Sequence, residues 1–162
     1  MLALGRVDRA VVEDSARTAV AAAGSFLIAH LLRMPEAYWA AISTIIVVQS
    51  TLGAAWSISS QRFAGTVLGT ASGALLSTYF GSNLAVFAVG VFLLGLLCAA
   101  LGVGSAYRFA GVTLAITMLV ARTSPAWVVA LHRFVEVSVG IVVGLVISAL
   151  WPTVVGAQRK AR

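Results

Sequence analysis

Apolar segments alternate with short polar or turn-forming stretches six times along this chain. A helix that crosses the ~30 Å hydrocarbon core of a bilayer needs about 20 residues. Segments near this length occupy residues 16–34, 37–55, 62–80, 84–103, 105–123 and 128–151. The breaks carry residues that favour turns, namely Pro35, Gly81 to Asn83, Gly102 to Ser105, and Ser124-Pro125. The pattern predicts an all-α membrane protein with six transmembrane helices.

The third and sixth segments share a motif at a shift of 71 positions. Each opens on an arginine-phenylalanine pair followed by small residues at equal spacing: Arg62-Phe63 with Gly69, Gly73 and Ser77, and Arg133-Phe134 with Gly140, Gly144 and Ser148. The same shift brings the first segment onto the fourth and the second onto the fifth, by hydropathy only. A unit of three crossings must re-enter the membrane upside down, so the six helices are expected to form two inverted three-helix repeats. Chance similarity between two glycine-rich spans is the alternative.

Small residues recur every four positions in both of these segments. They are Gly65, Gly69 and Gly73 in the third, and Gly140, Gly144 and Ser148 in the sixth. Such a stripe lets the backbone of another helix approach closely. We expect the glycines to be helix-packing positions rather than binding residues.

The composition supports a membrane protein and excludes several other classes. The chain is 60% hydrophobic and 10% charged, with a mean hydropathy of +1.02, whereas soluble domains average about 45–50% apolar and about 25% charged residues. Its net charge is +6, but the basic residues stand singly between apolar runs, which argues against nucleic-acid binding. The single cysteine, Cys98, excludes an internal disulfide and a multi-cysteine metal site.

An enzyme is not expected, because the sequence has no nucleotide-binding loop, no histidine box and no clustered carboxylates. No cofactor or metal is predicted.

Charge placement predicts the topology. Residues 1–15 are read as a cytoplasmic segment rather than a cleavable signal, because they carry acidic residues among the arginines. Residues 16–152 form the transmembrane domain and residues 153–162 a basic cytoplasmic tail. An N-terminus inside places most arginines on the cytoplasmic side, including Arg62 and Arg108, and leaves Arg33, Arg122 and Arg133 outside. Both termini are therefore expected in the cytoplasm, and the protein is expected in the inner or plasma membrane.

Four charged residues are candidates for a solute pathway: Arg62, Arg108, Arg133 and Glu136. Only 13 uncharged residues separate Arg108 from Arg122, so one of these two arginines is expected about a turn inside the membrane. Glu136 follows Arg133 by one helical turn, at the position equivalent to Gly65. It is either a structural partner of Arg133 or an acid that couples or gates transport.

The stretch from Tyr38 to Phe80 resembles the core of the FUSC-type family of fusaric-acid resistance proteins and aromatic acid exporters. The resemblance rests on Trp39, the region around Gln49, and the motif that runs from Arg62 through Gly65-Thr66 and Gly69 to Gly73. Counting the sixth helix, it extends over about residues 15–152. It implies a six-helix block that moves organic anions, often aromatic carboxylates, across the inner membrane. Larger members have two such blocks, so the resemblance also implies a homodimer or higher homo-oligomer.

The sequence thus predicts an integral-membrane transporter or channel-like protein for organic anions. Arginines in or near the membrane would lower the barrier for a carboxylate. The alternative is a membrane component that does not transport and that assembles with another membrane protein.

Overall fold

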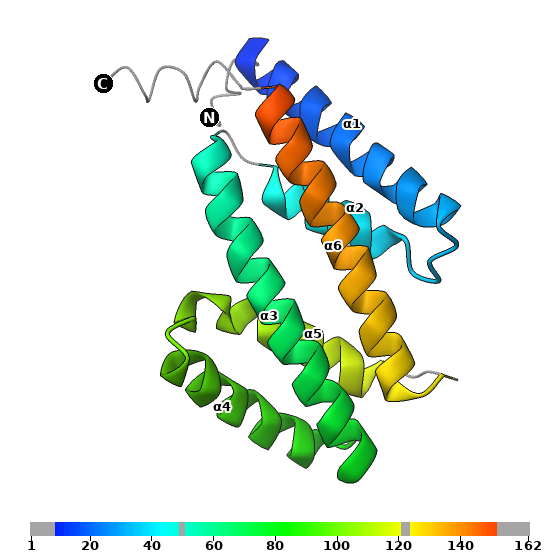
Figure 1. The fold of residues 1–162 in the computed structure, drawn as a ribbon, viewed down its shortest axis with the longest axis vertical. Helices are drawn as coiled ribbons and strands as arrows, with labels where there is room; N and C mark the ends of the chain where they lie inside the picture. The colour runs from blue at the N-terminus through cyan, green and yellow to red at the C-terminus, as the bar shows by residue number, and fades with distance from the viewer. Residues whose placement is uncertain (1–8, 49–50, 121–123, 152–162) are drawn as a thin grey trace, which may run out of the picture.

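The computed structural model describes residues 9–48, 51–120 and 124–151, which form six α-helices and one short 3₁₀-helix (Figure 1). No β-strand occurs in these ranges, so the described part of the chain is all-helical, as predicted. The elements are α1 (Arg9–Leu31), α2 (Tyr38–Val47), α3 (Leu52–Tyr79), α4 (Leu84–Ala100), η1 (Gly104–Ala106), α5 (Tyr107–Leu119) and α6 (Ala126–Leu150).

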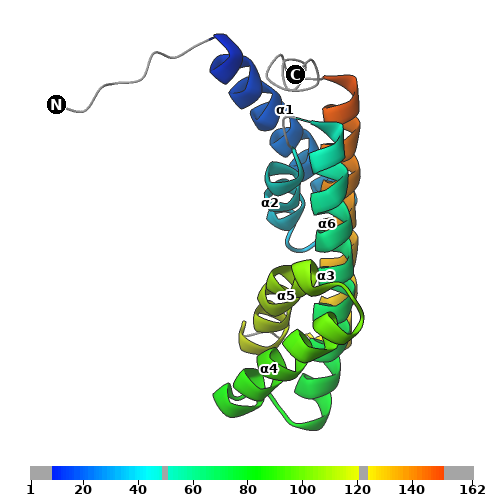
Figure 2. The same ribbon diagram turned by 90° about the vertical axis from the view of Figure 1, so that its left-hand side faces the viewer.

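The long helices α3 and α6 run antiparallel and side by side. The other four α-helices lie on one side of this pair (Figure 2). The α1–α2 pair lies at one end of the molecule and the α4–α5 pair at the other (Figure 1). Each short helix packs against the long helix of the other half of the chain: α5 on α3, and α2 on α6. The two halves of the sequence are therefore interlocked.

The boundary between α2 and α3 differs from the sequence prediction of helices at 37–55 and 62–80. Helix α2 ends at Val47, and Val48 is extended. Helix α3 begins at Leu52, because the side chain of Thr51 accepts a hydrogen bond from the backbone N–H of Ala54 and caps the new helix. The range 37–55, predicted as one helix, therefore contains the end of α2 and the start of α3, and Gln49 lies outside the described residues. As a result, Arg62 lies well inside α3 rather than at its start.

Other helix ends moved less. Helix α1 begins at Arg9, within the segment that was expected to precede the first helix, and α4 and α6 lie close to their predicted ranges. Helix α5 covers 107–119 instead of 105–123, and η1 precedes it. Gly81 and Gly102 adopt positive φ values in the turns on either side of α4, a conformation that glycine adopts without steric cost.

The glycine stripes lie where the short helices cross the long ones. A Cβ atom added to Gly73 would come within 2.7 Å of the Thr117 side chain on α5, and one added to Gly144 within 2.7 Å of Val47 on α2. Gly65 and Gly69 face α5 in the same way, and Gly140 faces α2. No larger residue fits at these crossings unless the helices separate.

Many large apolar side chains lie on the surface of the chain, among them Leu31, Phe92, Leu93 and Val142. Within the described ranges, α6 is the one helix that is both long and apolar enough to cross a membrane by length and composition, with a mean hydropathy of 2.0 in its best window. Helices α2 and α4 are also apolar but shorter. So much exposed apolar surface indicates contact with lipid or with other protein.

Candidate functional site

Two buried arginines, at positions that correspond under the 71-residue shift, each lie over an aromatic ring. The Arg62 guanidinium on α3 lies 5.3 Å from the centre of the Phe109 ring on α5. The Arg133 guanidinium on α6 lies 4.2 Å from the centre of the Trp39 ring on α2. Both distances fall in the range of a cation–π interaction. The same geometry therefore occurs at both crossings of a short helix with a long one.

The phenylalanines that follow these arginines contact each other. The rings of Phe63 and Phe134 meet edge to face, with their centres 5.5 Å apart. Positions that correspond under the 71-residue shift thus meet where α3 and α6 cross.

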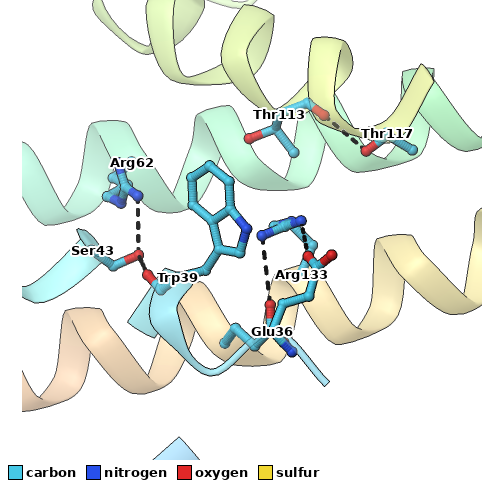
Figure 3. Close-up of polar contacts among 8 residues, drawn as sticks. Glu36, Trp39, Ser43, Arg62, Thr113, Thr117 and Arg133 are labelled. Atoms are coloured by element: carbon cyan, nitrogen blue, oxygen red, sulfur yellow. Dashed lines mark hydrogen bonds and ion pairs between the residues drawn. The ribbon is translucent and has the colours of Figure 1, made fainter. Parts of the chain in front are cut away.

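Both arginines line one small, partly open cavity of about 20 Å³. Its walls come from four helices, and the lining residues are Trp39, Arg62, Thr66, Phe109, Val112, Thr113, Ile116, Arg133 and Val137. Figure 3 shows the Trp39 ring between the side chains of Arg62 and Arg133. A space of this size holds about one water molecule. In this conformation the site is closed to a larger solute.

The Arg133 side of the site is rich in negative charge. Arg133 is 2% exposed and forms an ion pair with Glu36, from the loop between α1 and α2. Its Nη1 atom also lies 3.7 Å from Oε2 of Glu136, which is 1% exposed. The other carboxylate oxygen of Glu136 accepts a hydrogen bond of 2.9 Å from the backbone N–H of Glu36. Two carboxylates therefore surround one guanidinium.

The Arg62 side has no such compensation. Arg62 is 6% exposed, and its Nη2 atom donates a 3.0 Å hydrogen bond to the hydroxyl of Ser43 (Figure 3). No carboxylate of the described residues forms an ion pair with it. A buried charge without a counter-ion is costly. Arg62 is therefore a buried cation without an ion-paired carboxylate among the described residues.

Several donors around the cavity have no hydrogen-bond acceptor among the described atoms, although one of them, Nη1 of Arg133, lies in the ion pair with Glu136. They are Nε of Arg62, Nε and Nη1 of Arg133, and Nε1 of Trp39. The hydroxyls of Thr66 and Thr113 instead donate to backbone carbonyls of their own helices. Buried donors normally have an acceptor. The cavity can thus accept a molecule that brings acceptor atoms, such as an anion or a water.

The structure brings together three of the four residues expected on a solute pathway. Arg62, Arg133 and Glu136 belong to this site, and Glu136 lies beside Arg133 as its sequence spacing indicated. Arg108 does not join them, since its side chain is exposed on α5. Arg122 lies outside the described residues. Groups of three or more His, Cys, Asp or Glu side chains that could hold a metal are absent from the described ranges.

Sequence reasoning missed Glu36 and Phe109 and did not place Trp39 in the candidate site. Trp39 is half-buried and lines the cavity. A usable signal existed for the rings. Trp39 and Phe109 each lie near the start of a short helix, four positions before a buried hydroxyl residue, which is Ser43 after Trp39 and Thr113 after Phe109. Glu36 is 97 positions from Arg133, and no sequence spacing marks that pair.

Comparison with known proteins gave one match. A family model described as fusaric acid resistance protein-like matches residues 21–147. Neither the curated proteins nor the solved structures contain a match.

Proposed function

Since residues 21–147 match its family model, the chain belongs to the fusaric acid resistance protein-like family, and we propose that it transports organic anions across the membrane, as a carrier or a channel. The match confirms the resemblance seen in the sequence. Membership implies a membrane protein, related to transporters, that resides in a lipid bilayer. The anions, their possible aromatic character and the absence of enzymatic activity are parts of the proposal.

The observation that carries the proposal is the unpaired charge of Arg62. The Arg62 guanidinium is 6% exposed, donates a hydrogen bond to a neutral hydroxyl and lines the cavity. In a membrane protein, a buried charged side chain of this kind typically belongs to a pathway for ions or substrates. Arginines at such a position favour entry of anions and oppose cations. The Phe109 ring below Arg62 and the Trp39 ring nearby offer apolar surface to an aromatic solute.

Passage of an organic anion requires the site to open, because its present volume holds about one water. Opening is proposed to occur by movement of α2 against α6 or of α5 against α3. At both of these contacts, glycines without a side chain let the two helices pack closely. The paired arrangement of α2 on α6 and α5 on α3 supports an inverted repeat, in which opposite movements expose the site to opposite sides.

We propose that both ends of the chain lie on the same, cytoplasmic side of the membrane. Arg17 near the start of α1 donates a 2.8 Å hydrogen bond to the backbone carbonyl of Trp151, which follows α6. The first and last helices therefore come together at one end of the molecule. The basic residues near the two termini of the sequence support a cytoplasmic location.

The experiment is anion uptake into liposomes that contain the purified protein. A benzoate gradient is expected to drive uptake by the unmodified protein. An Arg62→Gln variant should lose most of it, because the buried charge that stabilises the anion is gone. One charge near 4 Å contributes about 4 kcal/mol at an effective dielectric constant of 20, which is several powers of ten in rate at most.

Arg108→Gln is the matched control, since the same change is made at an exposed arginine of α5. It should retain most uptake. No uptake of any organic anion by the unmodified protein would contradict the proposal. Equal losses of uptake in both variants would show that Arg62 has no specific role in anion transport.

A second candidate is a membrane component that assembles with another protein without transporting. The small volume of the cavity favours it, as does an apolar groove of about 290 Å³ between α3 and α6 that includes Trp56, Phe63, Ile141 and Leu145. The groove also offers a surface for the homo-oligomer expected from the sequence. The uptake assay separates this candidate from transport.

A further inference from the structure

Resting on the proposed transport function, we propose that Glu36 makes the site selective for anions with one carboxylate over anions with two. The two arginines of the site differ in what already neutralises them. Only one of them is available to a carboxylate of the solute.

Arg133 is already matched. Glu36 contacts its Nη2 atom, and Glu136 lies 3.7 Å from its Nη1 atom. A solute carboxylate that approached Arg133 would have to displace Glu36 and would meet the charge of Glu136. Like charges in a buried site repel strongly.

Arg62 is available, since its one hydrogen bond in the described structure goes to the Ser43 hydroxyl. Both arginines line the same cavity of about 20 Å³, with the Trp39 ring between them (Figure 3). The first carboxylate of a solute can pair with Arg62. A second carboxylate on the same solute adds a negative charge that Glu36 and Glu136, beside Arg133, repel across the Trp39 ring.

Glu36 is better placed than Glu136 to set this preference. Its side chain is 33% exposed and comes from the loop between α1 and α2, whereas Glu136 is 1% exposed within α6. Glu136 also holds the loop through the backbone N–H of Glu36, a bond that does not depend on the side chain at position 36. Removing the charge of Glu36 therefore leaves the loop attached and frees Arg133 for the solute.

The test compares uptake of benzoate and phthalate into liposomes by the unmodified protein and a Glu36→Gln variant. The unmodified protein should prefer benzoate. In the variant, the ratio of phthalate to benzoate uptake should rise roughly tenfold, which corresponds to removing one charge repulsion of about 1.4 kcal/mol. Glu36→Asp, which keeps the charge, should retain the preference for benzoate.

Glu13→Gln is the matched control, because Glu13 forms an ion pair with Arg9 on the surface of α1 and does not line the cavity. Its uptake ratio should equal that of the unmodified protein. Benzoate uptake with an unchanged ratio in Glu36→Gln would overturn this inference while leaving the transport function intact. Absence of both uptakes in the unmodified protein would overturn the transport function itself, and the inference with it.

Discussion

The two arginine sites of this molecule have the same scaffold and opposite electrostatics. Arg62 and Arg133 both lie in a long helix, over an aromatic ring from a short helix of the other half of the chain. Arg133 has Glu36 and Glu136 beside it, whereas Arg62 has the Ser43 hydroxyl. The difference teaches that a shared framework of helices and glycines can surround one arginine with carboxylates and leave the other with a neutral hydroxyl partner.

The position that distinguishes the two sites most simply is one turn after each arginine. It is Gly65 after Arg62 and Glu136 after Arg133. Gly65 allows α3 to approach the backbone at Ala106 and Ala110 closely. At the corresponding position of α6, Glu136 instead places a carboxylate beside Arg133. Packing is thus favoured at one site and charge neutralisation at the other.

The largest expected effect on stability comes from removing Arg133, and removing Arg62 provides the comparison. Arg133→Gln leaves Glu36 and the buried Glu136 without their cation, and we expect a loss of about 3–5 kcal/mol. Arg62→Gln removes a charge that no described carboxylate pairs with, so its effect should lie within about 1 kcal/mol. Denaturant unfolding in detergent micelles measures both. Equal losses would show that Arg62 has a counter-ion as strong as that of Arg133.

A smaller effect should be the same at both sites, because the helix crossings are alike. Gly69→Ala and Gly140→Ala each place a methyl group against the backbone of a short helix, at Ala110 and Ala40, and each should destabilise the protein by about 1–3 kcal/mol. Gly24→Ala is the control, since a Cβ there meets no atom within 4 Å, and it should be neutral or stabilising by up to about 1 kcal/mol. Thermal unfolding of the three variants makes the comparison. A cost at only one crossing would mean that the two are not equivalent.

Much of the helix arrangement follows from local sequence signals, which the six apolar segments and their turn residues provide. The end of α2 was wrong because the polar residues near Gln49 were interpreted as part of one long helix, although Thr51 is a strong helix cap. The interlocked packing of α2 on α6 depends on contacts between distant parts of the chain. Hydropathy does not encode such contacts.

In the candidate site, too, contacts within one helix were predictable from the sequence and contacts between distant parts of the chain were not. The spacing of Arg133 and Glu136 predicted their proximity, because one helical turn separates them. Glu36 reaches the site from a loop in the other half of the chain, and the fold alone creates that contact. Arg108 was expected near the pathway from the short distance to Arg122, but helix α5 turns its side chain outward.

The most direct test measures benzoate binding next to Arg62. The readout is the fluorescence of Trp39, which lines the same cavity. A protein with Trp56, Trp127 and Trp151 replaced by phenylalanine keeps Trp39 as its one tryptophan, and all three replaced rings are exposed. Benzoate should change the Trp39 emission in a saturable way. The change should vanish with Arg62→Gln and persist with Arg108→Gln. Saturable binding that survives Arg62→Gln would contradict the central claim that Arg62 is the arginine available to the anion.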